Sequence, residues 1–219
     1  MSITLNIKNQ SYLHNVILNT LKFINPYLTY QINNNIYNLY THQFNESDLN
    51  TYYNNMIDKA VYDDCLFIFN DNVESYVHTV NGGGNANIRE YKKDLRCWGI
   101  PTGTSSPYKG FTALTEEIAH SGLVKNILDR SIQDIKAVIY HRRITRFPVK
   151  HIIYSAYHEK LISIDDKKIP TLAQSLFKIG DEVSEYIIKQ LYDIYINLDN
   201  MSVRLITFCH EILIYLKIK

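Results

Sequence analysis

Two short apolar runs constrain the fold of this chain more than any other feature of its sequence. Residues 65–69 (CLFIF) form an uninterrupted apolar run with acidic and Asn-rich flanks, and residues 151–156 (HIIYSA) form a second run of this type. Such runs are typical of strands that are buried on both faces of a sheet. Residues 123–138 lie between them and carry apolar side chains at helical spacing. This order predicts a βαβ-like unit.

The length of 219 residues and an apolar content of 46% are enough to bury a core around such a unit. We therefore expect an α/β protein with a mixed or mostly parallel sheet and helices on both faces. Residues 61–219 form the α/β domain in this interpretation, and residues 1–60 form a helical N-terminal extension that packs on it. Further expected elements are a helix ending at Asn25, a helix from Ser47 or Asp48 to about Ala60, a charged loop over 157–170, a helix capped by Asp181, and a terminal helix over 201–216.

Charge and cysteine content exclude several classes of protein. Lys and Arg number 23 against 22 Asp and Glu, so the net charge of +1 does not favour nucleic acid as a main partner. No long uncharged apolar segment indicates a membrane span, and the first ten residues lack the pattern of a signal peptide. Three widely spaced cysteines, Cys65, Cys97 and Cys209, indicate a reducing intracellular compartment. The many Asn and Tyr residues suggest an AT-rich genome, such as that of some large viruses, parasites or bacteria.

Glycine is concentrated in one part of the chain. Six of the eight glycines lie within residues 82–110, and three of them are consecutive, at Gly82, Gly83 and Gly84. Consecutive glycines expose backbone N–H groups that can approach phosphate oxygens, and Asn85 and Asn87 add amides that can hold a ribose or a base. The run matches neither a P-loop nor a dinucleotide-binding fingerprint, so a flexible turn between strands stays open as the alternative.

Two other segments carry candidate chemistry. Asn70, Asp71 and Asn72 directly follow the first apolar run, where an acidic group could hold a base or activate water. Residues 98–103 (WGIPTG) contain Thr102 and dictate a particular backbone path. An ordinary turn remains the alternative for both segments. The basic stretch over 136–151 is expected to be a solvated connection, with phosphate binding as the alternative. No His or Cys spacing indicates a metal site or a cofactor.

The order of these motifs resembles a family of uncharacterised proteins of large DNA viruses and bacteria. The similar segments are FNDN at 69–72, GGGNANIREY at 82–91, GIPTG at 99–103 and GFTAL at 110–114, and the match continues to about residue 192. That family is more distantly similar to phage macro-domain-like proteins. The resemblance implies a three-layer α/β/α fold that binds ADP-ribose and in some members hydrolyses it from proteins or nucleic acids.

The resemblance also implies roles for individual residues. Asp71 would fix the base or activate water as the catalytic group, Arg89 would neutralise phosphate, and the glycines would cradle it. The complete expected ligand-binding set is Asn70, Asn72, Gly82, Gly83, Gly84, Asn85, Asn87, Arg89, Thr102 and Ser155. Two departures concern this site: Glu90 replaces a proline of the family, and the segment after Ala156 lacks the glycines of the family loop.

Three functions stay open at this point. The first is recognition of a nucleotide or ADP-ribose-like ligand, with or without hydrolysis. The second is non-catalytic binding that sequesters a signalling nucleotide, or binds a host or ADP-ribosylated protein, in the cytoplasm of an infected cell. The third is a nuclease or phosphodiesterase that uses a histidine such as His78 or His120.

Overall fold

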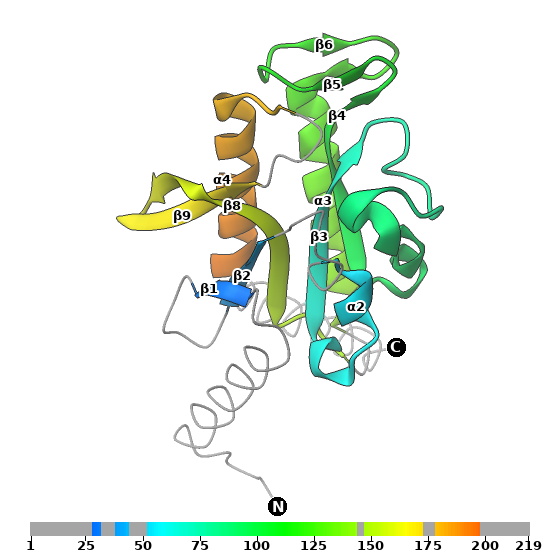
Figure 1. Cartoon of the computed structure of the whole chain (residues 1–219), viewed down its shortest axis with the longest axis vertical. Coiled ribbons are helices and arrows are strands. Elements are labelled where there is room, and N and C mark those ends of the chain that lie inside the picture. Colours follow the sequence, from blue (N-terminus) through cyan, green and yellow to red (C-terminus); the bar gives the residue numbers. More distant parts are fainter. Residues whose placement is uncertain (1–27, 32–37, 44–51, 144–146, 173–177, 198–219) are drawn as a thin grey trace, which may run out of the picture.

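The computed structural model describes residues 28–31, 38–43, 52–143, 147–172 and 178–197 (Figure 1). Its elements are β1 (Leu28–Gln31), β2 (Asn38–Gln43), α2 (Asn54–Ile57), the 3-10 helix η2 (Ala60–Tyr62), β3 (Cys65–Asn72), the 3-10 helix η3 (Gly84–Asp94), β4 (Cys97–Ser105), β5 (Tyr108–Gly110), β6 (Glu117–Ile118), β7 (Gly122–Leu123), α3 (Val124–Arg142), β8 (His151–Ile164), β9 (Lys167–Leu172) and α4 (Asp181–Ile196).

A mixed sheet of seven strands forms the centre of the molecule. The strand order is β1-β2-β8-β3-β4-β5, and β9 pairs with the far part of β8. The four central strands, β2, β8, β3 and β4, are mutually parallel, whereas β1, β5 and β9 are antiparallel to their neighbours. The two predicted apolar runs are the adjacent parallel strands β3 and β8, so the predicted α/β architecture is confirmed.

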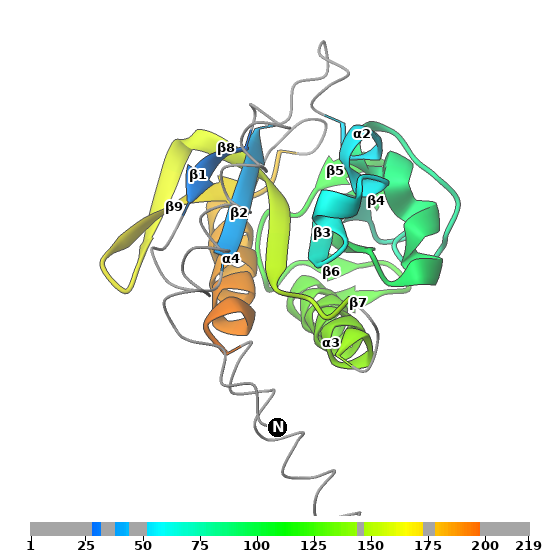
Figure 2. The ribbon, with the colours of Figure 1, turned by 90° about the horizontal axis from the view of Figure 1, so that it is seen from below.

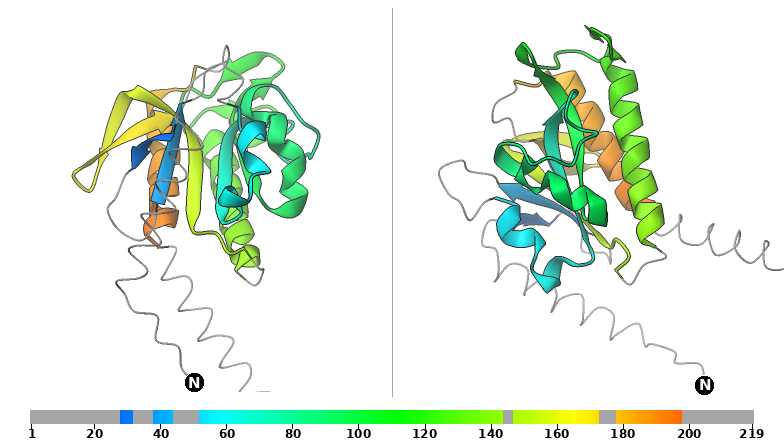
Figure 3. Two further views of the ribbon diagram at one scale, coloured as in Figure 1. Left: turned by 60° about the horizontal axis from the view of Figure 1, so that its bottom comes forward. Right: turned by 90° about the vertical axis from the view of Figure 1, so that its right-hand side faces the viewer.

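Helices cover both faces of this sheet (Figures 2 and 3). Leu66 and Ile68 of β3 pack in one core cluster with the apolar faces of α3 and α4. Phe67 and Phe69 alternate to the opposite face and pack in a second cluster with α2 and η3. This alternation explains why β3 is apolar at successive positions. None of the described helices is long and apolar enough to cross a membrane.

The two long helices agree closely with their sequence pattern. The predicted helix over 123–138 is α3, which begins at Val124 and continues to Arg142, and its apolar positions are buried except for Leu123, which precedes the helix and is exposed. The helix predicted from Asp181 is α4, but Gly180 is the N-cap residue and Asp181 lies in the first turn. The expected cap by Asp181 is therefore wrong by one position, although an acidic first turn still interacts favourably with the helix dipole.

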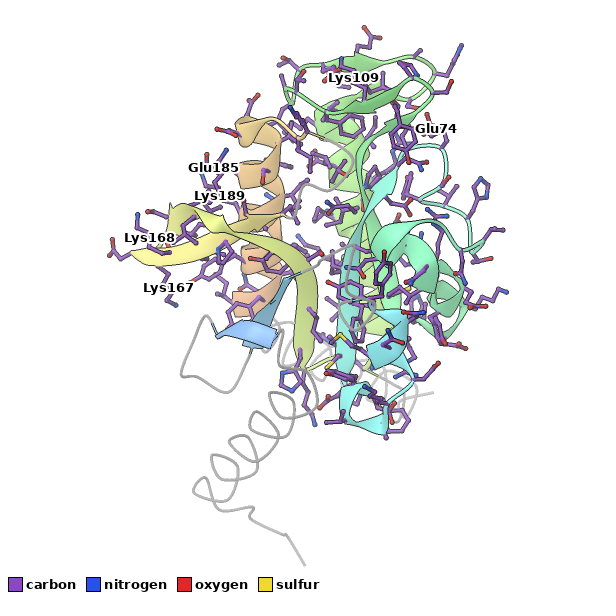
Figure 4. The ribbon with its side chains drawn as sticks, viewed as in Figure 1. Glu74, Lys109, Lys167, Lys168, Glu185 and Lys189 are labelled. Atoms are coloured by element: carbon purple, nitrogen blue, oxygen red, sulfur yellow. The ribbon has the colours of Figure 1, made fainter. Side chains whose placement is uncertain are left out.

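The charged loop predicted over 157–170 is wrong. The structure has a β-hairpin there, since β8 continues to Ile164 and β9 returns alongside it. The two turn residues, Asp165 and Asp166, have φ values of 48° and 61°, which is the left-handed conformation of the tight turns that match strand twist. The many charged residues of this segment favoured a loop prediction over a hairpin. Lys167 and Lys168 lie at the outer end of the hairpin (Figure 4).

The helical interpretation of residues 1–60 is also corrected. Residues 28–31 and 38–43 are the strands β1 and β2, and β2 pairs in parallel with β8 over its whole length. Backbone pairing therefore makes residues 28–31 and 38–43 strands of the central sheet. Of the helix expected up to Ala60, the described residues contain the short helix α2. The helices expected to end at Asn25 and to span 201–216 lie outside the described residues.

Candidate functional site

The structure brings Asp71 and Arg89 together at the carboxyl end of β3. Arg89 Nε donates to Asp71 Oδ2 over 3.1 Å and Arg89 Nη2 donates to Oδ1 over 2.6 Å. The two residues are only 2% and 6% exposed. A bidentate, charge-assisted pair of this kind is among the stronger polar interactions in proteins, and it joins η3 to the sheet.

Other hydrogen-bonding groups of this pair contact the backbone. Arg89 Nη1 donates to the carbonyl oxygen of Val80 over 2.6 Å, and the N–H of Asn72 donates to Asp71 Oδ1 over 2.9 Å. Thr102 Oγ1 lies 3.4 Å from the carbonyl oxygen of Asp71. Asp71 and Arg89 were both expected to contact a ligand. In the structure they instead pair with each other, between β3 and η3.

Two motif glycines make room for the ion pair. A Cβ atom on Gly99 would lie 2.5 Å from Asp71 Oδ2, and a Cβ atom on Gly82 would lie 2.9 Å from Arg89 Nη2. The first distance is far inside van der Waals contact, so any side chain at residue 99 would displace the carboxylate. One glycine of the GGG motif and one of the GIPTG motif therefore contribute space for the ion pair.

Gly83 differs from Gly82 in the space around its Cβ position. It is exposed, and a Cβ atom added to it would meet nothing within 4 Å. Its φ of −79° and ψ of 166° are extended values that any residue can adopt. The N–H of Gly82 donates to Ala86 O over 2.9 Å and the N–H of Ala86 donates to Gly83 O over 3.1 Å. The Gly-rich loop is consequently a closed turn whose outer edge, at Gly83, faces open space.

Asn85 connects three parts of the chain. Its Oδ1 accepts from the N–H of Tyr53 over 3.0 Å, and its Nδ2 donates to Ser155 Oγ over 3.1 Å. The hydroxyl of Tyr53 donates to Ile68 O over 3.2 Å, and burial raises the pKa of this hydroxyl well above its ordinary value. The predicted site residues Asn85 and Ser155 are thus in contact, and both are buried.

The three other predicted asparagines lie around these contacts. Asn72 Oδ1 accepts from the N–H of Ser75 over 2.9 Å and closes the turn after β3. Asn70 is half-buried at the end of β3. Asn87 Oδ1 is buried and has no hydrogen-bond partner among the described groups. Because it is buried, this acceptor is not accessible to a ligand in the structure, although the Asn87 residue itself is half-buried.

Lys92 is a member of the buried cluster that sequence reasoning missed. Its Nζ lies 3.7 Å from Asp71 Oδ2 and donates to the carbonyl oxygen of Tyr76. In a 3-10 helix, residues three apart lie on one face, so Ala86, Arg89 and Lys92 all face the sheet. The spacing of the two basic residues is the signal that could have identified Lys92.

A shallow pocket of about 260 Å³ lies at the opposite, amino ends of β3 and β4. It is lined by Asp63, Asp94, Leu95, Arg96, Arg142 and Phe147. Arg142 is buried and donates to the carbonyl oxygens of Cys65 and Phe147 over 2.6 and 3.0 Å. Through these hydrogen bonds Arg142 connects α3 to the sheet. The solvated connection predicted over 136–151 is therefore wrong at Arg142.

No group of three His, Cys, Asp or Glu side chains suited to a metal ion occurs within the described part of the chain. His78 and His120 are both exposed. Comparisons with protein-family models, with curated proteins and with solved structures find no match to this chain.

Proposed function

We propose that this chain binds a nucleotide or ADP-ribose-like ligand at the Gly-rich loop, beyond the carboxyl ends of β3 and β8, in a macro-like arrangement. The observation that carries the proposal is Gly83, an exposed glycine with open space at its Cβ position in a turn that two backbone hydrogen bonds, between Gly82 and Ala86 and between Ala86 and Gly83, close. An exposed backbone held in this way can accept close approach of a phosphate oxygen at a small cost in loop ordering.

The position of the loop in the fold supports the proposal. In open α/β sheets, ligands bind beyond the carboxyl ends of parallel strands. Gly82 contacts Arg89 at the end of β3, and Asn85 contacts Ser155 in β8, so the loop extends over two adjacent parallel strands. The first N–H groups of η3 follow directly after Gly83, and helix N-termini favour anions.

Binding without hydrolysis is the better of the two mechanisms under this proposal. A general base must reach a water molecule or a substrate proton, but both carboxylate oxygens of Asp71 accept hydrogen bonds from Arg89. Asp71 and Arg89 then shape the loop, and the ligand contacts fall to the backbone at Gly83 and Gly84.

Gly83→Val tests the proposal. The extended backbone at residue 83 tolerates valine and its Cβ meets no atom, so we expect a melting temperature within about 2 °C of the wild type. The branched side chain would occupy the space of the ligand, so affinity for ADP-ribose or ADP, measured by calorimetry, should fall by about a hundredfold or more.

Lys93→Ala, an exposed position on η3, is the matched control and should bind as the wild type does. Equal affinity in Gly83→Val and wild type would remove the loop from the site. Release of ADP-ribose from modified protein or nucleic acid by the wild type would contradict the non-hydrolytic mechanism.

A further inference from the structure

Two buried cations hold the backbone of the loop between β3 and the Gly-rich turn. Lys92 Nζ donates to Tyr76 O, and Arg89 Nη1 donates to Val80 O over 2.6 Å. These carbonyl groups flank the exposed tip of the segment, in which Val77 is 63% and Val80 is 75% exposed. We name residues 76–83 the clamped loop. The segment between β3 and η3 lies on the side of the molecule away from the β8–β9 hairpin (Figures 1 and 2).

The clamped loop has little apolar burial of its own. Tyr76 is its one buried hydrophobic residue, and the Val77 and Val80 side chains point to solvent. A segment with few buried apolar contacts opens at low free energy unless polar contacts hold it. The position of this loop therefore depends on the hydrogen bonds to its backbone.

Lys92 is not needed to neutralise Asp71. Arg89 already pairs with both oxygens of that carboxylate, at 2.6 and 3.1 Å, whereas Lys92 Nζ lies 3.7 Å from the nearer one. The lysine side chain is 3% exposed, and a second buried cation is costly. Burial lowers the pKa of Lys92, and Asp71 opposes that shift. Part of the cost is offset by the rings of Phe69 and Trp98, whose centroids lie 5.5 and 5.2 Å from Nζ.

We propose that Lys92 is a positioning residue: by holding Tyr76 O, it fixes the clamped loop and so presents Gly83 in one conformation. The claim about the loop stands on the contacts above, and its consequence for binding rests on the proposed function. Arg89 holds the far side of the loop, and Asp71 orients both cations.

Lys92→Met is the direct test, because methionine fills the apolar part of the site without the charge or the donor. It leaves Asp71 paired with Arg89, so the variant creates no unpaired buried charge. The measurement is amide hydrogen exchange at Tyr76 and His78, whose N–H groups donate to Asn72 O and Ser75 O over 3.0 and 2.9 Å. We expect exchange at these two amides to accelerate by about tenfold or more while the amides of α3 are unchanged.

Lys92→Arg, which retains a cation and donors, should preserve part of this protection, and Lys93→Met is the control on the exposed side of η3. Unchanged exchange at Tyr76 and His78 in Lys92→Met would overturn the proposal. Equal acceleration in α3 would also overturn it, since it would show a general stabilising role.

Affinity for ADP-ribose separates the two proposals. If wild type binds ADP-ribose, Lys92→Met should weaken binding by about tenfold, through a faster dissociation from a loosened loop. Selective loss of loop protection in a protein whose wild type binds no nucleotide would sustain the positioning role and reject the proposed function.

Discussion

Arg89 is the residue on which the polar cluster depends, because it contacts both the sheet and the clamped loop. It donates two hydrogen bonds to Asp71 and one to Val80 O. Sequence reasoning placed Asp71 and Arg89 at one site but could not show that they pair with each other. Two residues 18 positions apart come into contact only when the chain folds. An acidic residue between an apolar run and a Gly-rich motif has the same sequence pattern in a catalytic site and in a buried ion pair.

Arg89→Ala would leave Asp71 buried with Lys92 as its one remaining cationic partner among the described residues. Removing one member of a buried ion pair commonly costs about 3–5 kcal/mol, and Lys92 places the expected loss of unfolding free energy at about 3 kcal/mol. Urea denaturation measures this loss, with Lys93→Ala as the control. A loss below about 1 kcal/mol would show that the pair contributes little to stability.

Glu116 has a similar organising role at the start of α3. It accepts hydrogen bonds from Lys109 and from the N–H and hydroxyl of Thr112, and its own carbonyl accepts from the N–H of Val124. Although partial burial raises its pKa, the hydrogen bonds from Lys109 and Thr112 outweigh burial and lower it to about 2. The charged form of Glu116 thus stabilises the segment between β5 and α3.

This lowered pKa predicts a stability that depends on pH. The folded value of about 2 lies below the ordinary value of 4.5, so the stabilisation is complete above pH 4.5 and is lost as the pH falls toward 2. The melting temperature of wild type should exceed that of Glu116→Gln near pH 6, and the two should converge near pH 2. A difference that is constant over this range would contradict the role of the charge.

At the scale of elements, the apolar parts of the sequence predicted structure well and the polar parts did not. The strands β3 and β8 and the helices α3 and α4 were predictable because their burial leaves a local pattern of period two, period 3.6 or an unbroken run. The strands β1, β2 and β9 escaped prediction because Asn-rich and Lys-rich segments favour loops locally. Their structure comes from backbone pairing, since β2 and β9 pair with β8 and β1 pairs with β2. The sequence of each segment does not encode this pairing by itself.

At the scale of the whole molecule, the two ends of the parallel strands have different chemistry. The carboxyl ends carry the clamped loop, which includes the exposed Gly83, and the amino ends carry the pocket lined by Arg96, Arg142 and Phe147. We propose ligand binding at the carboxyl ends because the exposed backbone of Gly83 lies there, whereas Arg142 at the amino ends joins α3 with the sheet.

Titration of ¹⁵N-labelled protein with ADP-ribose, followed by amide chemical shifts, tests this assignment most directly. We expect the largest shifts at Gly83, Gly84 and Asn87, smaller shifts over the rest of the clamped loop (residues 76–82), and none above noise at Leu95 and Arg96. Largest shifts at Leu95 and Arg96, or no shifts at millimolar ADP-ribose, would contradict the claim that the Gly-rich loop is a nucleotide-binding site.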